Sequence, residues 1–219
     1  MKRSHVLILS VLPIVLNNVL TPIAIAGFVG FREFVKNPAY YIFLYGPYLW
    51  SVYEIFLAYL ALVFLRREGG DVKRVIGGFR DRPLLSIAIV IGFTALSMSL
   101  NYVSSLMFGA STSSNLIKML PLFTVLYLAT VGSIIAGICE EFIWRGYLLT
   151  RFETLTSKKV VAVVIQAILF GLYHGPYAIS PVVFGLIAGL IYIKTRRLTP
   201  LMISHTIIDS IGFTIAYLT

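Results

Sequence analysis

The chain has 219 residues, of which 58% are hydrophobic and only 12% are charged, and its mean hydropathy is +0.91. Soluble domains carry about 25% charged residues, so this composition excludes a soluble enzyme or binding domain. The formal net charge of +9 does not indicate a nucleic-acid partner, because most of the basic residues cluster in loops between apolar segments. The single cysteine, Cys139, excludes an intrachain disulfide.

Seven apolar segments follow one another, and they predict one all-α bundle of about seven transmembrane helices, with eight as the alternative. The segments cover residues 6–30, 39–65, 84–109, 116–150, 160–174, 181–193 and 199–218. The first is too long for the apolar part of a signal peptide, so we interpret it as a retained span. The fourth is too long for one simple crossing, and we expect a kink near Gly132. No soluble part separates from the rest, so we expect residues 1–219 to form a single membrane-embedded domain.

Most basic residues fall in loops that share one side of the membrane if the chain begins in the cytoplasm. They are Lys2, Arg3, Arg66, Arg67, Lys73, Arg74, Arg80, Arg82, Arg151, Lys158, Lys159, Lys194, Arg196 and Arg197. The other side receives only Arg32, Lys36 and Lys118. Because basic loops remain cytoplasmic, we expect an integral protein of the cell membrane with its N-terminus in the cytoplasm.

Glu54 is the first acidic residue inside an apolar segment. By helical rise it lies about 16 Å from the basic loop that starts at Arg66. A hydrogen bond to a neighbouring tyrosine is the simplest interpretation, and a place in the wall of a polar cavity is the alternative. The sequence assigns Glu54 no role.

The fourth segment contains Glu140, Glu141 and Arg145. A charge near the bilayer centre costs about 2.5–3.5 kcal/mol on insertion scales, so such residues are usually paired, inward-facing and functional. Glu141 and Arg145 are four residues apart, which places them on one helix face as an ion pair. Glu140 is rotated by about 100° and cannot reach the same partner. We therefore expect Glu140 to face a cavity, where it suits a general base, and a salt-bridged helix end is the structural alternative.

His174 stands at the end of the fifth segment, and Gly175 and Pro176 then end the helix. The helix from Lys159 to His174 is about 22 Å long, shorter than a hydrocarbon core of about 30 Å. With the short segment 181–193 it predicts a hairpin that stops inside the membrane, beside protein or a wet cavity. For His174 taken alone, a capping or packing role is the simpler interpretation.

His205 and Asp209 are four residues apart on one face of the last segment. By helical rise His205 lies about 12 Å from Arg197, and Glu140 lies about 16 Å from Arg151, so the two reach comparable depths. An aspartate one turn from a histidine can orient its ring or share a proton with it. A hydrogen bond between spans is the structural alternative for this pair. Three polar sites in one short chain nevertheless indicate a common site.

These residues resemble, in order, the three motifs of the CPBP family, which is also called Abi. The motifs are Glu140-Glu141-x-x-x-Arg145, Phe170-x-x-x-His174 and His205-x-x-x-Asp209. The family includes the CAAX prenyl endopeptidases and the bacteriocin-processing or self-immunity proteins. The resemblance covers residues 115–215, which we take as the catalytic core, whereas the N-terminal helices of residues 1–110 show no match.

The resemblance implies an intramembrane endopeptidase with a cavity open to the cytosol. It implies that Glu140 and His174 activate the attacking water, and that His205 and Asp209 stabilise the oxyanion. Glu141 and Arg145 then support the helix. The family often has asparagine where this chain has Asp209, and a carboxylate donates to an oxyanion only when it is protonated. Orienting His205 is therefore the alternative role of Asp209.

Two histidines and a glutamate are also a set of zinc ligands, but the His-Glu-x-x-His helix of zinc proteases is missing from the sequence. We expect no cofactor, with a zinc-dependent protease as the alternative. The expected partners are the lipid bilayer and a membrane-anchored peptide or protein substrate, with or without a prenyl group, and no nucleic acid. The alternative functions are a non-enzymatic membrane immunity or scaffold protein and a small transporter, although no inverted repeat supports the latter.

Overall fold

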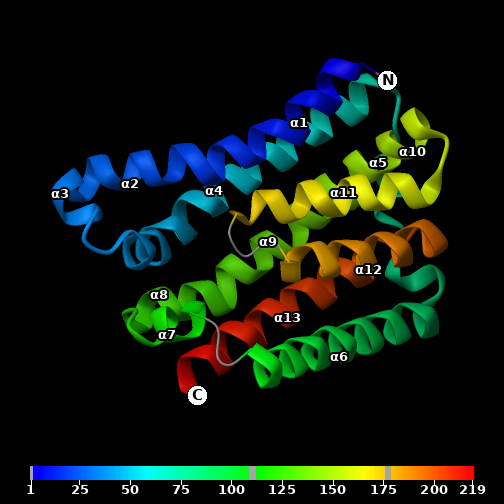
Figure 1. The fold of residues 1–219 in the computed structure, drawn as a ribbon. Helices are drawn as coiled ribbons and strands as arrows, with labels where there is room; N and C mark the ends of the chain where they lie inside the picture. Colours follow the sequence, from blue (N-terminus) through cyan, green and yellow to red (C-terminus); the bar gives the residue numbers. More distant parts are fainter. Residues whose placement is uncertain (1, 109–111, 176–178) are drawn as a thin grey trace.

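Long helices lie side by side in the computed structural model, which describes residues 2–108, 112–175 and 179–219 (Figure 1). Five helical stretches among these residues are long and apolar enough to cross a membrane. They are α1 (Arg3–Val15) continued by α2 (Thr21–Val29), α4 (Pro38–Arg67), α6 (Pro83–Phe108), α8 (Leu122–Tyr127) continued by α9 (Ser133–Glu141) and α10 (Thr150–Thr156), and α13 (Thr199–Leu218). Two shorter apolar helices, α11 (Lys159–Tyr173) and α12 (Ile179–Thr195), account for the remaining predicted segments. The predicted all-α membrane bundle is confirmed, and the chain is an integral membrane protein.

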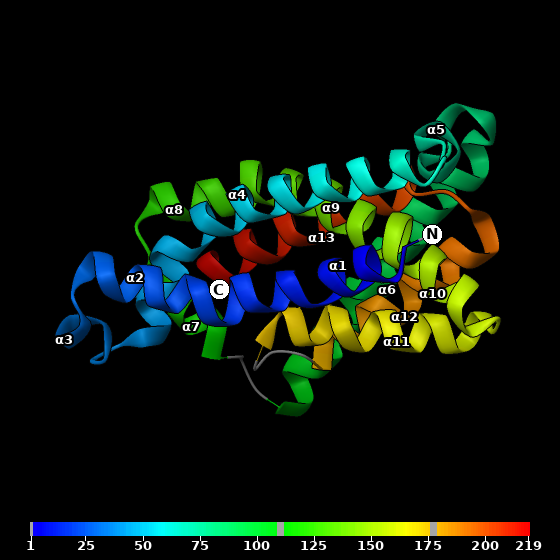
Figure 2. The ribbon, with the colours of Figure 1, turned by 90° about the horizontal axis from the view of Figure 1, so that it is seen from above.

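Different helices gather at the two ends of the bundle (Figures 1 and 2). The N-terminus, α5 (Val72–Ile76) and α10 gather at one end. The opposite end holds α3 (Phe31–Phe34), α7 (Thr112–Lys118), α8 and the C-terminus. We call the first end the basic end, because Lys73 and Arg74 of α5 and Arg151 of α10 lie there. The two chain termini therefore lie at opposite ends, as an odd number of crossings requires.

Glu68, just after α4, ties several helices together at the basic end. Its carboxylate accepts hydrogen bonds from the backbone N–H of Lys2 (3.1 Å), the hydroxyl of Tyr147 (3.2 Å) and Nε of Arg151 (3.0 Å). Nδ1 of His5 lies 2.9 Å from the same carboxylate. Burial raises the pKa of Glu68, but the hydrogen bonds from Lys2, His5 and Arg151 outweigh burial, so the pKa lies below its usual value.

The fourth predicted segment differs from expectation at its start. It begins at Leu122 rather than at residue 116, because Pro121 precedes the helix and α7 ends at Lys118. A π-helical stretch, Leu128–Gly132, lies where the sequence predicts a kink, and a second one, Phe142–Leu149, follows α9. The kink itself stays a prediction. Single π-helical stretches inside α-helices are frequent at functional sites. The third segment, 84–109, agrees with α6 except for residue 109, which lies outside the described residues.

The predicted short hairpin consists of α11 and α12, which run side by side (Figure 1). Glycines of α12 allow the close approach: a Cβ at Gly185 would lie 3.1 Å from Cα of Ala167. At Gly189 a Cβ would lie 3.1 Å from the side chain of Val163. Small residues at such positions let helix backbones pack closely inside a membrane. Helix α11 ends as predicted, and Gly175 adopts φ +68°, whereas Pro176 lies outside the described residues.

The helix with the acidic pair lies at the centre of the bundle. Every residue from Phe142 to Leu149 is buried, although a helix at a bundle surface buries only one face. Helices α4 and α13 pack against α9, while α1, α11 and α12 pack against the following π-helical stretch. The sequence thus places its most costly polar side chains where helices, not lipid, surround them.

Candidate active site

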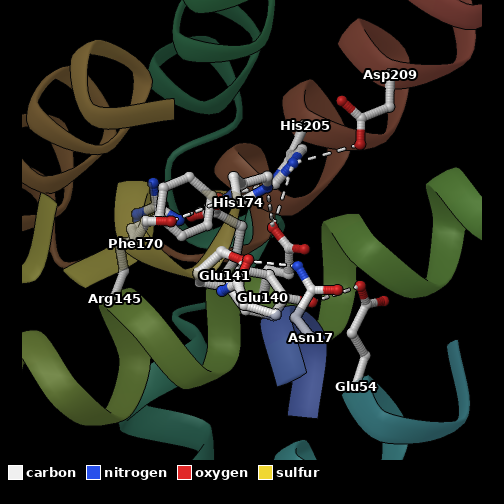
Figure 3. Close-up of polar contacts among 11 residues, drawn as sticks. Asn17, Glu54, Glu140, Glu141, Arg145, Phe170, His174, His205 and Asp209 are labelled. Atoms are coloured by element: carbon white, nitrogen blue, oxygen red, sulfur yellow. Dashed lines mark hydrogen bonds and ion pairs between the residues drawn. The ribbon is translucent and has the colours of Figure 1, made fainter. Parts of the chain in front are cut away.

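The three motifs meet inside the bundle, and their side chains point toward one another (Figure 3). Glu140 and Glu141 end α9, His174 caps the C-terminus of α11, and His205 lies on α13. Oε2 of Glu140 lies 4.0 Å from Nε2 of His174 and 3.8 Å from Nε2 of His205. Residues far apart in the sequence therefore surround one carboxylate oxygen.

Glu141 holds two partners rather than the one that its spacing predicts. Nη1 of Arg145 donates to Oε1 of Glu141 at 2.9 Å, which is the expected ion pair, and both side chains are 0% exposed. Nδ1 of His205 lies 2.9 Å from the same oxygen. The Arg145 guanidinium also lies over the ring of Phe170, 4.4 Å from its centre, and near Phe184. The Glu141 carboxylate therefore binds the buried Arg145 cation and orients the ring of His205.

The hydrogen bond between His205 and Glu141 fixes which ring nitrogen of His205 faces Glu140. An ion-paired carboxylate only accepts, so Nδ1 of His205 carries the proton in its bond to Glu141. Nε2 then points to Oδ2 of Asp209 at 3.4 Å and to Oε2 of Glu140 at 3.8 Å. The predicted neighbours His205 and Asp209 are thus in contact, and the ring is held from both sides.

His174 is oriented by the helix that it ends. Its Nδ1 lies 2.9 Å from the carbonyl oxygen of Phe170. Because a carbonyl only accepts, Nδ1 carries a proton, and in this tautomer Nε2 presents a lone pair toward Glu140. In the described part of the chain, Oε2 of Glu140 is buried and has no hydrogen-bond partner. A water oxygen about 2.8 Å from both Oε2 and Nε2 would bridge their 4.0 Å separation.

The site is closed at the acidic pair and open at its edge. The Glu140 and His205 side chains are each 6% exposed, whereas His174 is 31% and Asp209 28% exposed. A substrate would therefore reach Glu140 past His174 and Asp209. Two surface hollows, of about 400 and 500 Å³, are lined by residues outside this cluster. The cavity open to the cytosol stays a prediction.

Two polar residues of the N-terminal helices, Glu54 and Asn17, also reach this site. The sequence assigns Glu54 no role, and sequence reasoning missed Asn17. The hydroxyl of Tyr173 donates to Oε1 of Glu54 at 3.1 Å, so the tyrosine interpretation of Glu54 is confirmed. The Glu54 and Glu140 carboxyls are close enough for their charges to repel each other, which agrees with a place of Glu54 in the site wall. Nδ2 of Asn17 donates to the backbone carbonyl of Tyr173 at 2.6 Å. An asparagine inside an apolar segment was the sequence signal for this contact.

The metal alternative gains no support from these distances. In the ranges that the structure describes, no group of three or more His, Cys, Asp or Glu side chains is arranged to hold a metal ion. Glu140, His174 and His205 still have the chemistry of a zinc donor set. A protease without a cofactor therefore stays the prediction, and zinc dependence stays the alternative.

Residues 122–211 match the family model described as "Type II CAAX prenyl endopeptidase Rce1-like". The matched range includes all three motifs, from Glu140 to Asp209, and so confirms the resemblance to the CPBP family for this part of the chain. The match supports an intramembrane protease family, while the helices before Leu122 lie outside it. The comparisons with curated proteins and with solved structures give no match.

Proposed function

We propose that this chain is an intramembrane endopeptidase that hydrolyses a peptide bond of a membrane-anchored peptide or protein with glutamate-activated water. One observation carries the proposal: Oε2 of Glu140, buried and unpartnered among the described residues, lies within 4.0 Å of Nε2 of both histidines. Peptide hydrolysis needs a base beside the water and donors where negative charge grows. This arrangement offers both in a site largely shielded from solvent.

The reaction starts with a water held between Glu140 and Nε2 of His174. Glu140 takes one proton while the water oxygen forms a bond to the scissile carbonyl carbon, and the carbonyl oxygen becomes an oxyanion. Protonated Nε2 of His205 donates to that oxyanion, and Glu141 holds the ring through Nδ1. The C–N bond then breaks, and the proton on Glu140 passes to the leaving nitrogen. Atoms and charge balance with water as the only co-reactant.

Asp209 acts in this scheme through His205. It lies 3.4 Å from Nε2, and as a carboxylate it accepts hydrogen bonds but does not donate one to an oxyanion. Its contact keeps the ring directed at the reacting centre.

We also propose that the basic end faces the cytoplasm and that the protein lies in the cell membrane. The basic residues of α5 and α10 lie at this end together with the N-terminus, and such loops stay on the cytoplasmic side. The substrate then carries a membrane anchor, and a prenyl group is one such anchor.

The test uses purified protein in liposomes and fluorogenic peptides anchored by a prenyl or an acyl chain. Wild-type protein is expected to cleave, and Glu140→Gln to lower the rate by at least about 100-fold, because the amide cannot accept a proton. Glu153→Gln is the matched control, since Glu153 lies on the same helix in a surface ion pair with Arg196, 2.6 Å away. Full activity of Glu140→Gln would refute the proposal, and loss of activity with a chelator followed by recovery with Zn²⁺ would favour the zinc alternative.

The non-enzymatic alternative makes the opposite prediction for the same variant. A scaffold or immunity protein that binds its partner through this cluster needs shape and hydrogen bonds, which Glu140→Gln largely keeps. Partner binding that survives Glu140→Gln, with no peptide cleaved by wild type, would support that function instead.

A further inference from the structure

The end of α11, which carries His174, contacts two helices of the N-terminal half (Figure 3). A helix leaves its last four backbone carbonyls without partners inside the helix, and at membrane depth each needs another donor. Two of those four in α11, the carbonyls of Leu172 and Tyr173, accept from side chains of the first span. Nδ2 of Asn18 lies 3.0 Å from the Leu172 oxygen, and Nδ2 of Asn17 lies 2.6 Å from the Tyr173 oxygen.

The two asparagines that contact the end of α11 lie in an irregular part of the first span. Asn17 and Asn18 lie in its π-helical stretch, Leu16–Leu20. The neighbouring chain fits closely against them, because a Cβ at Gly175 would lie 2.6 Å from Oδ1 of Asn18. Gly175, the residue after His174, is therefore packed directly on Asn18.

The side chain of Tyr173 is held at its other end by α4. Its hydroxyl donates to Oε1 of Glu54 at 3.1 Å, and Tyr173 and Glu54 are each only 6% exposed. The Glu54 carboxyl interacts in turn with Glu140. Tyr173 is thus fixed by Asn17 at its backbone and by Glu54 at its hydroxyl, and His174 is the next residue along the chain.

We propose that Asn17 and Glu54 are positioning residues that act through Tyr173 and set Nε2 of His174 in front of Glu140. This inference rests on the proposed hydrolysis. Both residues lie outside the matched range 122–211, so the N-terminal helices complete the site rather than only surround it. Both bonds are between elements distant in sequence, so they fix the helix end relative to the bundle and not only within α11.

Single-atom and conservative variants test this inference. Tyr173→Phe removes only the hydroxyl, and it is expected to lower kcat by about 10-fold to 100-fold with little change in KM, as misplacement of a reacting group does. Asn17→Ala is expected to act similarly. Tyr192→Phe is the matched control, because that buried hydroxyl donates to the Val75 carbonyl at 3.2 Å, away from the site.

Glu54 is tested by rescue. Glu54→Gln keeps an oxygen that accepts from Tyr173 and is expected to retain most of kcat, whereas Glu54→Ala is expected to lose about as much as Tyr173→Phe. The double variant Tyr173→Phe with Glu54→Ala should lose no more than either alone, because both remove one bond. Equal losses in Glu54→Gln and Glu54→Ala would refute positioning through this bond.

A readout without substrate separates this inference from the proposed function. Diethylpyrocarbonate modifies the unprotonated Nε2 of His174, and mass spectrometry measures the rate. Asn17→Ala and Tyr173→Phe are expected to change that rate by about threefold or more, since they release the helix end, while Tyr192→Phe matches wild type. Unchanged rates in folded variants overturn the inference even if wild type is an active protease. An inactive wild type with changed rates overturns only the proposed function.

Discussion

Replacing Glu141 by glutamine should strongly destabilise the protein, because it breaks a buried ion pair from one side. The carboxylate accepts from Arg145 and contacts His205, each at 2.9 Å, and the Glu141 and Arg145 side chains are 0% exposed. Removing one member of a buried pair costs about 3–5 kcal/mol, because the other charge stays buried. Polar contacts between membrane helices contribute less, about 0.6–1.7 kcal/mol, but that range does not include a buried charge that has lost its partner. We therefore expect a loss of about 3 kcal/mol or more.

Double variants separate the stability of this pair from its role in activity. Glu141→Leu with Arg145→Met removes both charges and should recover most of the lost stability, as apolar replacement of buried pairs does. It should remain inactive, because Nδ1 of His205 loses its acceptor. Glu141→Gln with Arg145→Met keeps an acceptor for His205 and should recover part of the activity.

The assay is an SDS titration in mixed micelles, read as the free energy of unfolding, together with peptide cleavage in liposomes. Glu33→Gln is the control, because its ion pair with Lys36 has 53% and 67% exposed side chains and should contribute no more than about 1 kcal/mol. Wild-type stability of Glu141→Gln would refute the burial argument. Full activity of Glu141→Leu with Arg145→Met would refute the orienting role of Glu141.

Three further predictions follow from contacts in the same bundle. Gly137→Ala should destabilise the protein by about 1–3 kcal/mol, because the added Cβ would lie 2.9 Å from the backbone oxygen of Met202 on α13. Gly212→Ala should stabilise the protein by about 0.5–1 kcal/mol in the same SDS titration, because nothing lies within 4 Å of its Cβ. Because the pKa of Glu68 is lowered in the folded protein, Glu68 stabilises the fold fully above its unfolded pKa of about 4.3, and this stabilisation is lost as the pH falls through the lower folded pKa. The free energy of unfolding of Glu68→Gln should therefore depend less on pH than that of wild type below about pH 4.3. Asp209→Asn should keep peptide cleavage within about 10-fold of wild type, because an amide can still accept from Nε2 of His205, whereas Asp209→Ala should lose more than that.

Hydropathy predicted the helical segments because a membrane span is a local property of the chain. The ion pair of Glu141 and Arg145 was predictable for a similar reason, since helix geometry alone brings residues four apart together. Hydropathy alone places the start of the fourth span too early, because leucines and isoleucines continue across the break before Pro121. That proline was the available signal for a helix boundary.

Contacts between spans were beyond sequence reasoning. The second partner of Glu141 lies 64 residues away, the partner of Glu54 lies 119 residues away and that of Asn17 lies 156 residues away. Periodicity and spacing say which face of a helix a residue occupies, but not which helix packs on that face. The motif resemblance predicted that Glu140, His174 and His205 act together, and it contained no information about the helices that hold Tyr173.

The short length of α11 explains how its histidine is oriented. The last four carbonyls of this helix all have donors: Phe170 accepts from Nδ1 of His174 at 2.9 Å and Gly171 from the backbone N–H of His174 at 2.8 Å, while Leu172 and Tyr173 accept from Asn18 and Asn17. A helix that crossed the whole membrane would give the Phe170 carbonyl to a backbone N–H one turn later. Nδ1 of His174 would then have no fixed acceptor, and either ring nitrogen could carry the proton. Ending the helix at this depth therefore selects the tautomer whose Nε2 faces Glu140, and the first span supplies the donors that the shortened helix needs.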